Sequence, residues 1–554
     1  MLNHLRNLVT LVDEGDRSRR RWWWAELVGA VLGDFGLIYC QILALQKQRA
    51  GQSYARETLM YAGAIVLWYV ADLRLWGRTG KGLAHGVHRL TDRLIERLRR
   101  LPLDRFETLG RGDLMTRLTG DTQRVVNATP AVIGGPLGLL RLVFGAVFAL
   151  SVQPKIAGVA AGAMILVGMA IAAQMQVMNS GFGRMAGDEA RLYDLLRGHV
   201  VGAIPIKLHR ARAEAIRRAF AAISDGLRDL RVGIFAVFFE REHAANAVLY
   251  GILGVNVFLL PLFVETGNEA IREINLVLVW VVFSVFGIVF TLPELSRAGD
   301  ALDRLQDLDA RLNDDALEPE VHGAPVARDR FAGFRRIETR GLSFHYPSTP
   351  DRSGFAVGPI DLRFERGRII FITGFNGSGK STFLKMLTGL YPTEAGELRV
   401  DDQVIARDDL ADYRALFATI FTDHHLFARA YGVSPEAEVQ APALLAEMEI
   451  EDKTAIVGGR ITDRDLSAGQ KKRLAMVLAR LQDRPILVFD EWAADQDPEY
   501  RALYYLKVLP ALRDAGKLVI AVTHDDQYFH CADETFHFDD GQVTEGARVP
   551  GQRS

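Results

Sequence analysis

The chain has 554 residues, a formal net charge of −2 and 49% hydrophobic residues. Its length predicts about three or four domains, and its near-neutral charge excludes the overall basic field typical of nucleic-acid-binding proteins, so we expect no nucleic-acid partner. The two cysteines, Cys40 and Cys531, belong to no metal-binding or redox cluster. Long apolar runs crowd roughly the first 295 residues, whereas roughly the last 220 have the composition of a soluble α/β domain.

Six apolar segments of the first part are long enough to cross a membrane, because a spanning helix needs about 20 mainly apolar residues. Several exceed the length of an ordinary buried helix, which disfavours the alternative of a large soluble helical core. We therefore predict a transmembrane domain over 1–312 that lies in a lipid bilayer. Its spans are about 24–46, 57–77, 129–151, 155–178, 236–264 and 273–293.

Basic residues are concentrated in the N-terminal tail and in the segments at about 78–128 and 179–232. The alternate loops are short, and one of them, ETGNEAIRE, is acidic, although QKQRAGQSYAR after the first span is basic. Because cytoplasmic loops carry the excess of basic residues in membrane proteins, both termini are predicted to lie in the cytoplasm.

The two Arg-rich segments have apolar residues at helical spacing, as in GVHRLTDRLIERLRRLPLDRFE, and are predicted to extend the spans into the cytoplasm. Each segment is interrupted once, at TLGRGD and at VGAIPIK. Such bends would place a short helix at the far tip, where it could contact another domain.

Ionisable residues inside the predicted spans are functional candidates, because they usually face a bundle interior or an aqueous cavity. Asp34 and Arg141 lie deep in their spans and are predicted to face a polar transport cavity. For Glu26, Asp72 and the EREH cluster at 240–243, a span boundary placed one turn too far explains the charges equally well.

A linker rich in Pro, Asp and Glu, 313–330, precedes a predicted α/β domain over 331–548. Strand-like runs lead to GFNGSGKST, which fits the phosphate-binding loop G-x-x-x-x-G-K-[ST]. Its glycines let backbone N–H groups cradle phosphates at a helix N-terminus, so the expected ligand is ATP or GTP. The residues predicted to bind it are Gly374, Phe375, Asn376, Gly377, Ser378, Gly379, Lys380, Ser381 and Thr382.

Two adjacent carboxylates end a strand-like run in ILVFDEWAADQDPEY, from Ile486 to Tyr500. Burying such a pair is costly unless a cation compensates it. A nucleotide bound with Mg²⁺ supplies that cation. Ser381 and Asp490 are predicted to hold the metal, and Glu491 to face the water that attacks the γ-phosphate.

Two further strings complete a set of motifs. DLSAGQKKRLAMVLARL stands about twenty residues before the paired acids, and VIAVTHDD places His524 at the end of another apolar strand after them. With the phosphate loop, their order and spacing resemble the nucleotide-binding domain of ATP-binding cassette (ABC) transporters, whose signature motif is LSGGQ. Six spans followed by one such domain is the layout of ABC exporter half-transporters, so the resemblance covers the whole chain.

The resemblance implies a role for each matching residue. Tyr346 would stack on adenine, His524 would contact the γ-phosphate as the switch histidine, and Asp495 matches the acid of the D-loop. The signature residues would contact ATP held by the opposite subunit, so a homodimer is expected. These signature residues are Ser467, Gly469 and Gln470.

Three departures from the family pattern narrow the resemblance. Ala468 replaces a signature glycine, Thr422 stands where the Q-loop glutamine belongs, and the helical subdomain from Phe427 to Leu466 is short. Together with FDEWAADQDPEYR, these features resemble the bacterial exporters of cyclic peptides and peptide siderophores. Because Thr422 is too short to reach Mg²⁺ without a bridging water, the adjacent Asp423 is predicted to take the metal-facing role; the alternative is a solvated loop acid.

The predicted fold is thus an all-α six-helix transmembrane domain followed by an α/β P-loop ATPase domain with a short helical subdomain. The implied function is ATP-driven export of a cyclic peptide, peptide siderophore or similar small peptide-like compound across the bacterial inner membrane. An importer with the exporter fold, or a multidrug or lipid exporter, remains open. The six spans argue against a soluble ATPase, and the intact Glu491 argues against a channel that binds ATP without hydrolysing it.

Overall fold

A computed structural model describes residues 2–13, 16–152, 185, 187–189, 191–259, 268–312, 317–319, 330–346 and 354–545. The chain forms two compact units. The helical unit comprises Met1–Ile95 and Arg111–Arg311, and the α/β unit comprises Glu96–Gly110 and Leu312–Ser554. A short piece of chain from the first part, Glu96–Gly110, therefore belongs to the second unit.

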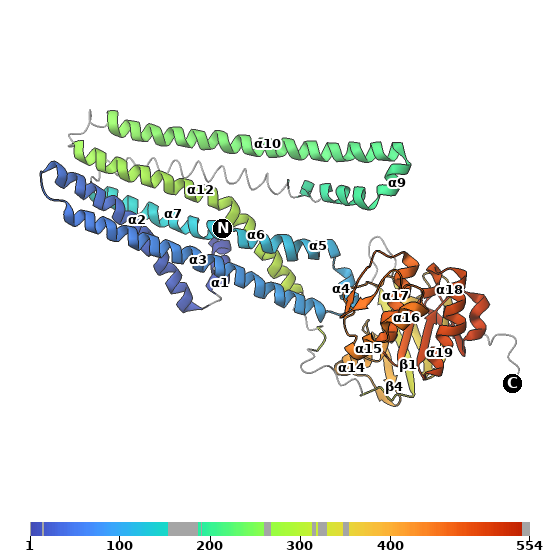
Figure 1. The fold of residues 1–554 in the computed structure, drawn as a ribbon. Coiled ribbons are helices and arrows are strands. Elements are labelled where there is room, and N and C mark those ends of the chain that lie inside the picture. The colour runs from blue at the N-terminus through green and yellow to red at the C-terminus, as the bar shows by residue number, and fades with distance from the viewer. Residues whose placement is uncertain are drawn as a thin grey trace. The chain divides into compact units, whose positions relative to one another are not determined.

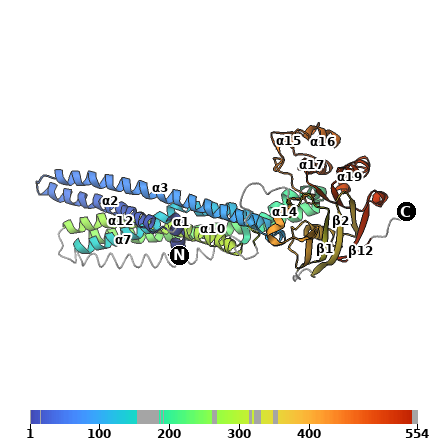
Figure 2. The same ribbon diagram turned by 90° about the horizontal axis from the view of Figure 1, so that it is seen from below.

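The helical unit consists of long helices, of which α2, α3, α7 and α12 lie side by side in both Figure 1 and Figure 2. Buried leucines of α3 are spaced by eight, seven and four residues, which places them on one face of the helix. They are Leu75, Leu83, Leu90 and Leu94. The elements are α1 Leu2–Asp13, α2 Arg17–Arg49, α3 Ala55–Arg99, α5 Arg111–Met115, η1 Thr116–Asp121, α6 Thr122–Asn127, α7 Thr129–Val152, α9 Ala203–Leu208, α10 Arg210–Gly254, η2 Val255–Leu259 and α12 Asn268–Arg311.

Helices run through the predicted spans wherever the structure describes them. Three stretches of the described chain have the length and hydropathy to cross a membrane: Ser18–Arg49, Ala55–Arg99 and Gly112–Phe148. The fifth predicted span enters α10 and η2, the sixth lies within α12, and the fourth, 155–178, falls outside the described residues. Large apolar side chains of α3, such as Leu59 at 76% and Val66 at 61% exposure, face outward, as expected for a surface covered by lipid.

Short helices occur where the sequence predicts breaks in the two Arg-rich segments. The helix α4, Leu103–Thr108, begins after Pro102 and ends at Leu109, whose backbone is extended. In the second segment the predicted break VGAIPIK is itself mostly the short helix α9, and the breaks flank it at Gly202 and the extended His209.

The α/β unit contains two main sheets in its described part. One has the strand order β2-β1-β4-β5 and is antiparallel; the other has the order β12-β11-β3-β10-β9-β6, with β11, β3, β10, β9 and β6 parallel and β12 antiparallel at the edge. The strands are β1 Arg336–Tyr346, β2 Phe355–Glu365, β3 Ile369–Gly374, β4 Ala395–Val400, β5 Gln403–Val404, β6 Phe417–Ile420, β7 Ile456–Val457, β8 Arg460–Ile461, β9 Ile486–Asp490, β10 Leu518–Val522, β11 Glu534–Asp539 and β12 Gln542–Glu545.

Helices cover both faces of the mainly parallel sheet. Alternate residues of β3 enter separate cores: Ile369 and Phe371 pack on one face, and Ile370 and Ile372 on the other. The helices α15 and α16 lie at the opposite end of the unit from β1 and β2 (Figure 2). The helical elements are α4 Leu103–Thr108, α13 Lys380–Leu387, η3 Arg407–Asp409, α14 Leu410–Arg414, α15 Pro435–Glu438, α16 Ala441–Glu447, α17 Ala468–Leu481, η4 Trp492–Asp495, α18 Pro498–Leu503, η5 Tyr504–Val508, α19 Leu509–Asp514 and η6 Asp526–Cys531.

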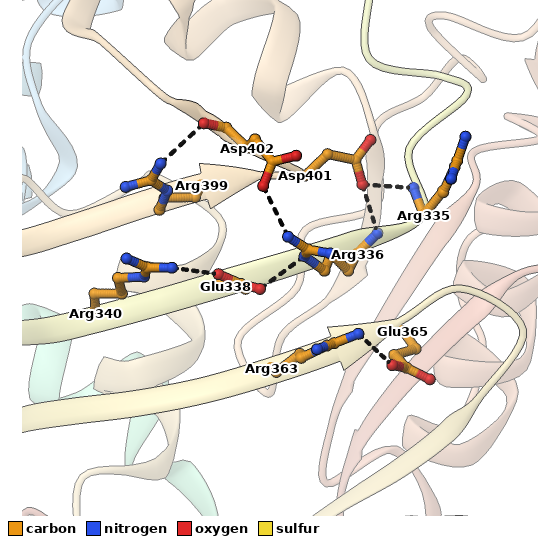
Figure 3. A network of polar contacts seen from close by, with 9 residues as sticks. All are labelled: Arg335, Arg336, Glu338, Arg340, Arg363, Glu365, Arg399, Asp401 and Asp402. Carbon is orange, nitrogen blue, oxygen red and sulfur yellow. Dashed lines mark hydrogen bonds and ion pairs between the residues drawn. The ribbon is translucent and has the colours of Figure 1, made fainter.

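The outer face of the antiparallel sheet carries a ladder of ion pairs (Figure 3). Glu338 lies between two arginines, with Arg336 at 2.7 Å and Arg340 at 3.2 Å, and Arg336 also contacts Asp402 at 2.8 Å. Exposed pairs of this kind contribute about 0–1 kcal/mol each. These pairs therefore stabilise the sheet only slightly.

Candidate nucleotide-binding site

The phosphate loop lies between the end of β3 and the start of α13. Three of its glycines have positive φ, with Gly374 at 138°, Gly377 at 83° and Gly379 at 100°, a conformation that a side chain disfavours. A Cβ on Gly379 would also meet Val357 at 2.8 Å. The loop therefore needs glycine at these positions, which let its backbone approach and cradle phosphate at the start of the helix.

Lys380 is buried at the first position of α13. Its ammonium donates to the carbonyl oxygens of Gly374 and Phe375, each at 2.9 Å, so the side chain curls back along the loop. Burial lowers the pKa of this ammonium, and the nearby Glu491 and Asp490 carboxylates oppose that shift. The cation is thus held inside the cradle, as phosphate binding requires.

Asp490, at the end of β9, has the environment of a metal ligand. The residue is 2% exposed, and its Oδ1 has no hydrogen-bond partner among the described residues. Burial raises the pKa of this carboxyl, with a hydrogen bond from Ser381 opposing the rise and the Glu491 carboxylate adding to it. A buried carboxylate oxygen beside a serine hydroxyl suits a hard cation, so Ser381 and Asp490 fit the predicted Mg²⁺.

Glu491 has a left-handed backbone, with φ 53° and ψ 39°, directly after this strand. Its carboxylate Oε1 lies 3.3 Å from Nε2 of His524, which follows the neighbouring parallel strand β10. Since the two strands run in register, with Val522 beside Asp490, their carboxyl ends bring both predicted catalytic side chains to one edge of the sheet.

The signature segment caps α17 and packs against the D-loop of the same chain. Ser467 and Gln470 form a capping box, with bonds of 3.2 and 3.0 Å. The Gly469 carbonyl accepts a hydrogen bond of 3.1 Å from the buried Gln496, and a Cβ on Gly469 would meet the Asp495 carbonyl at 2.9 Å. The cap and the predicted role in contacting ATP therefore use the same residues.

Tyr346, the predicted adenine-stacking residue, ends β1 beside the phosphate loop. Its hydroxyl lies 3.2 Å from Thr382 Oγ1 and 3.2 Å from the Tyr391 hydroxyl. The ring also packs edge to face against Phe344 at 5.1 Å. The structure thus brings Tyr346 to the loop that is predicted to hold the phosphates.

The loop after β6 contributes Thr422, which lies close to the acidic strand end. Its hydroxyl is 3.4 Å from the Asp490 carbonyl oxygen. The structure therefore brings Thr422 to Asp490, and the metal-facing role of Asp423 stays a prediction.

We expect Thr422→Ala to raise the Mg²⁺ concentration for half-maximal ATPase by about twofold to tenfold, because it removes a hydrogen bond worth about 0.5–1.5 kcal/mol beside Asp490. Magnesium titrations of purified Thr422→Ala and Asp423→Asn check this. If Thr422→Ala needs the same Mg²⁺ concentration as wild type and Asp423→Asn needs more, the role assigned to Thr422 is rejected. That result would support the metal-facing role of the Asp423 carboxylate.

Lys472 is a buried cation of this site that the motif analysis missed. Its ammonium donates to the Glu491 carbonyl at 2.8 Å and pairs with Asp495 at 2.8 Å, while its own carbonyl accepts 2.9 Å from the indole of Trp492. Helical spacing in the sequence could have indicated this burial. Lys472 lies three, four and seven residues before Ala475, Met476 and Ala479, which are on the buried face of α17. Lysine on such a face needs a partner.

The helix α4 supplies a second contact that motif spacing could not show. Glu107 pairs with Lys385 at 2.8 Å and accepts a hydrogen bond of 2.5 Å from the Tyr391 hydroxyl. Burial, together with the bond to Glu107, raises the pKa of Tyr391. Since α13 carries Lys385 and begins with Lys380, α4 contacts the helix that starts at the phosphate loop.

Within the helical unit, Asp34 on α2 and Arg141 on α7 form an ion pair. Arg141 donates hydrogen bonds from Nε, at 2.8 Å, and from Nη2 to the same oxygen of Asp34. The Asp34 side chain is 14% exposed and the Arg141 side chain 29%. Glu26 likewise pairs with Arg78 at 3.0 Å. Three of the candidate charges in the spans, Asp34, Arg141 and Glu26, therefore have charged partners, as the cost of an isolated charge in lipid demands.

Breaking the Asp34–Arg141 pair from one side should cost more stability than removing both charges, because a single change leaves an unpaired charge at a helix contact. We expect Asp34→Ala to lower the Tm in detergent by several degrees more than Asp34→Ala/Arg141→Ala does. An equal or larger loss in the double variant would contradict a coupled pair.

A loop that cradles phosphate, a buried acid suited to a cation and an adjacent glutamate–histidine pair define a P-loop ATPase, and the long apolar helices place it on a membrane protein. Family models match in both parts of the chain: the ABC transporter transmembrane region at residues 57–200 and the ABC transporter domain at residues 357–494. The chain belongs to the ABC transporter family and is an exporter-type half-transporter whose ATP hydrolysis drives transport.

The comparisons with individual proteins agree with this assignment. The chain is 31% identical over 490 residues to the ATP-binding protein SyrD of Pseudomonas syringae pv. syringae, covering 84% of each chain. It is 26% identical over 474 residues to the ATP-dependent lipid A-core flippase of Vibrio vulnificus, covering 80% of this chain and 77% of that protein.

The fold matches that of a bacterial Atm1-family ABC exporter solved with ATP bound. The TM-score is 0.72 at 16% identity, covering 96% of this chain and 95% of that one. This likeness confirms the predicted fold class, a helical transmembrane region followed by an α/β nucleotide-binding domain.

Proposed function

We propose that the chain exports a cyclic peptide, a peptide siderophore or a similar small peptide-like compound across the bacterial inner membrane, with both termini in the cytoplasm. The observation that carries this proposal is the combination of FDEWAADQDPEYR with Thr422 in the Q-loop. The short helical subdomain from Phe427 to Leu466 also supports the proposal. Between these residues the described structure has only two short helices, α15 and α16, and the small hairpin β7–β8.

Two copies of the chain would form the working transporter. Each chain has one phosphate loop and one signature. Ser467 of the signature is exposed, and its hydrogen bonds in the described structure go to Gln470 and not to the phosphate loop of the same chain. Aliphatic side chains at the tip around α9 are also strongly exposed: Val200 is 78%, Val201 79%, Ile204 74% and Leu208 71% exposed. An apolar tip of this kind requires a covering surface, which a second copy supplies.

The site residues suggest how ATP would be used. Lys380 and the loop N–H groups would hold the β- and γ-phosphates, and Tyr346 would stack on adenine. Mg²⁺ held by Ser381 and Asp490 would supply positive charge to the phosphate oxygens. Glu491 would orient and deprotonate the attacking water, and His524, which lies 3.3 Å from it, would contact the γ-phosphate.

Transport requires that the two states of the membrane region differ in affinity for substrate and for ATP. We propose that α4, through Glu107 and its contacts to Lys385 and Tyr391, passes motion of the nucleotide-binding domain to α3, and that Asp34 and Arg141 face the substrate cavity. The alternative of lipid export is favoured by the relatives named lipid A-core flippases.

Substrate-stimulated ATPase of the full chain in nanodiscs separates these alternatives. We expect cyclic peptides or peptide siderophores to raise the ATPase rate at micromolar concentration and lipid A to leave it unchanged. Stimulation by lipid A with no response to any peptide would overturn the substrate proposal while leaving ATP-driven transport intact.

Cross-linking tests the dimer. In a chain whose Cys40 and Cys531 are replaced, Asn376→Cys/Ser467→Cys should cross-link between chains when ATP is present, because the signature of one copy would meet the phosphate loop of the other. A cross-linked species of monomer mass, or no ATP dependence, would reject the arrangement in trans.

A further inference from the structure

A hollow of about 340 Å³ opens where α1, α2 and α3 meet. The end of α1 lines it and packs closely on α3: a Cβ on Gly82 of α3 would meet the Val12 carbonyl at 2.7 Å, so α3 needs glycine where α1 approaches it. The side chains that give the hollow its chemistry are Arg19, Trp22 and Trp23 from α2 and Arg78, Lys81 and His85 from α3.

Tryptophans of α2 and α3 stand at and near the hollow. Trp22, 61% exposed, and the buried Trp23, which donates 2.9 Å to Thr79, line the hollow. Trp24 and Trp76, 44% and 41% exposed, lie close to them along α2 and α3. Exposed tryptophans of this kind mark the headgroup level of a bilayer. The lipid-facing apolar stretch of α3 precedes this level, and the basic residues of α3 follow it.

The hollow has positive charge that the described residues do not fully neutralise. Asp13, an acid in its wall, is 1% exposed and already paired with Arg20 at 2.5 Å. Arg78 pairs with Glu26 at 3.0 Å, but no acidic side chain of the described chain lies within ion-pair distance of the exposed Lys81 or His85. An anionic group in the hollow would therefore gain contacts without displacing an internal partner.

We propose that this hollow binds the phosphate headgroup of an anionic phospholipid from the cytoplasmic leaflet. The Lys81 ammonium and the His85 ring would contact the phosphate, and the Trp22 indole would cover the glycerol and the upper acyl chain. Anionic lipids of the cytoplasmic leaflet attract basic residues beside a span. The proposal rests on the proposed orientation, which places this end of α3 on the cytoplasmic side. A bound lipid would hold α1 against α2 and α3.

The test is native mass spectrometry of the full-length protein with phosphatidylglycerol and phosphatidylcholine of identical acyl chains. We expect wild type to retain phosphatidylglycerol in preference to phosphatidylcholine. Lys81→Gln should weaken phosphatidylglycerol binding about fivefold, since one cation near the lipid surface contributes roughly that factor, and Lys81→Gln/His85→Gln should weaken it further. Arg56→Gln, which removes an exposed cation at the other end of α3, should have no effect.

Three results would overturn the proposal. Equal retention of the two lipids by wild type would remove the anionic preference, and equal loss in Arg56→Gln would show a general effect of charge. Displacement of phosphatidylglycerol by an equal concentration of soluble glycerol phosphate would show a free-phosphate site in place of a lipid site. The test measures lipid retention and not transport, so its result does not depend on whether the proposed substrate is correct. The ATPase activity of Lys81→Gln is measured in a separate assay.

Discussion

Glu491→Gln should reduce steady-state ATPase by at least about 100-fold while ATP still binds, because loss of a positioned general base typically costs about 10²–10⁴ in rate. The change keeps the size of the side chain and its contact distance to His524, which is 3.3 Å in the structure. Lys380 and the glycines of the phosphate loop are untouched, so the nucleotide should remain bound and a nucleotide-bound dimer should accumulate.

Phosphate release and retention of labelled ATP through gel filtration measure the two effects. Glu499→Gln is the matched control, since it removes an exposed glutamate eight residues later in the same segment. ATPase near the wild-type rate in Glu491→Gln would contradict the role assigned to Glu491. Loss of ATP binding would instead show that the substitution disrupts the site.

Lys472→Met should lower kcat about 10- to 100-fold and leave the affinity for ATP unchanged. The ammonium of Lys472 holds the carbonyl of Glu491 at 2.8 Å, where the backbone has the unfavourable φ of 53°. Without this bond, the carboxylate of Glu491 is no longer held in place, and a displacement of about 1 Å can cost about 10²-fold in rate. Methionine fills the buried space, so the fold is retained.

Lys471→Met is the control, because Lys471 is the exposed neighbour of Lys472 on the same helix. Asp495→Asn is informative as well, since it weakens one contact of Lys472 and leaves the bond to the Glu491 carbonyl. An unchanged kcat in Lys472→Met, or a fall in ATP affinity equal to the fall in kcat, would show that Lys472 does not position Glu491.

The sequence predicted those parts of the site in which the chemistry demands fixed spacing along the chain. The phosphate loop has glycines where the backbone takes positive φ, and Asp490 and Glu491 stand at the end of a fully buried strand. The sequence also placed His524 at the end of another strand, and the structure shows that this strand, β10, is the parallel neighbour of β9, with His524 beside Glu491.

Contacts between distant residues could not be predicted in this way. The Tyr391–Glu107 hydrogen bond joins residues 284 positions apart, and the Arg141–Asp34 pair joins residues 107 positions apart. Which of the many arginines faces which acid depends on how the helices pack, and helical periodicity fixes only the face of one helix. The left-handed backbone of Glu491 was also not predicted, because no glycine marks this position in the sequence.

Transport by inside-out membrane vesicles tests the central claim most directly, because the nucleotide-binding domain then faces the added ATP. We predict that vesicles with the wild-type chain accumulate a labelled cyclic peptide or peptide siderophore when ATP is added, and that vesicles with Glu491→Gln do not. Accumulation that is equal in the two, or ATP-driven loss of preloaded peptide from wild-type vesicles, would contradict ATP-driven export.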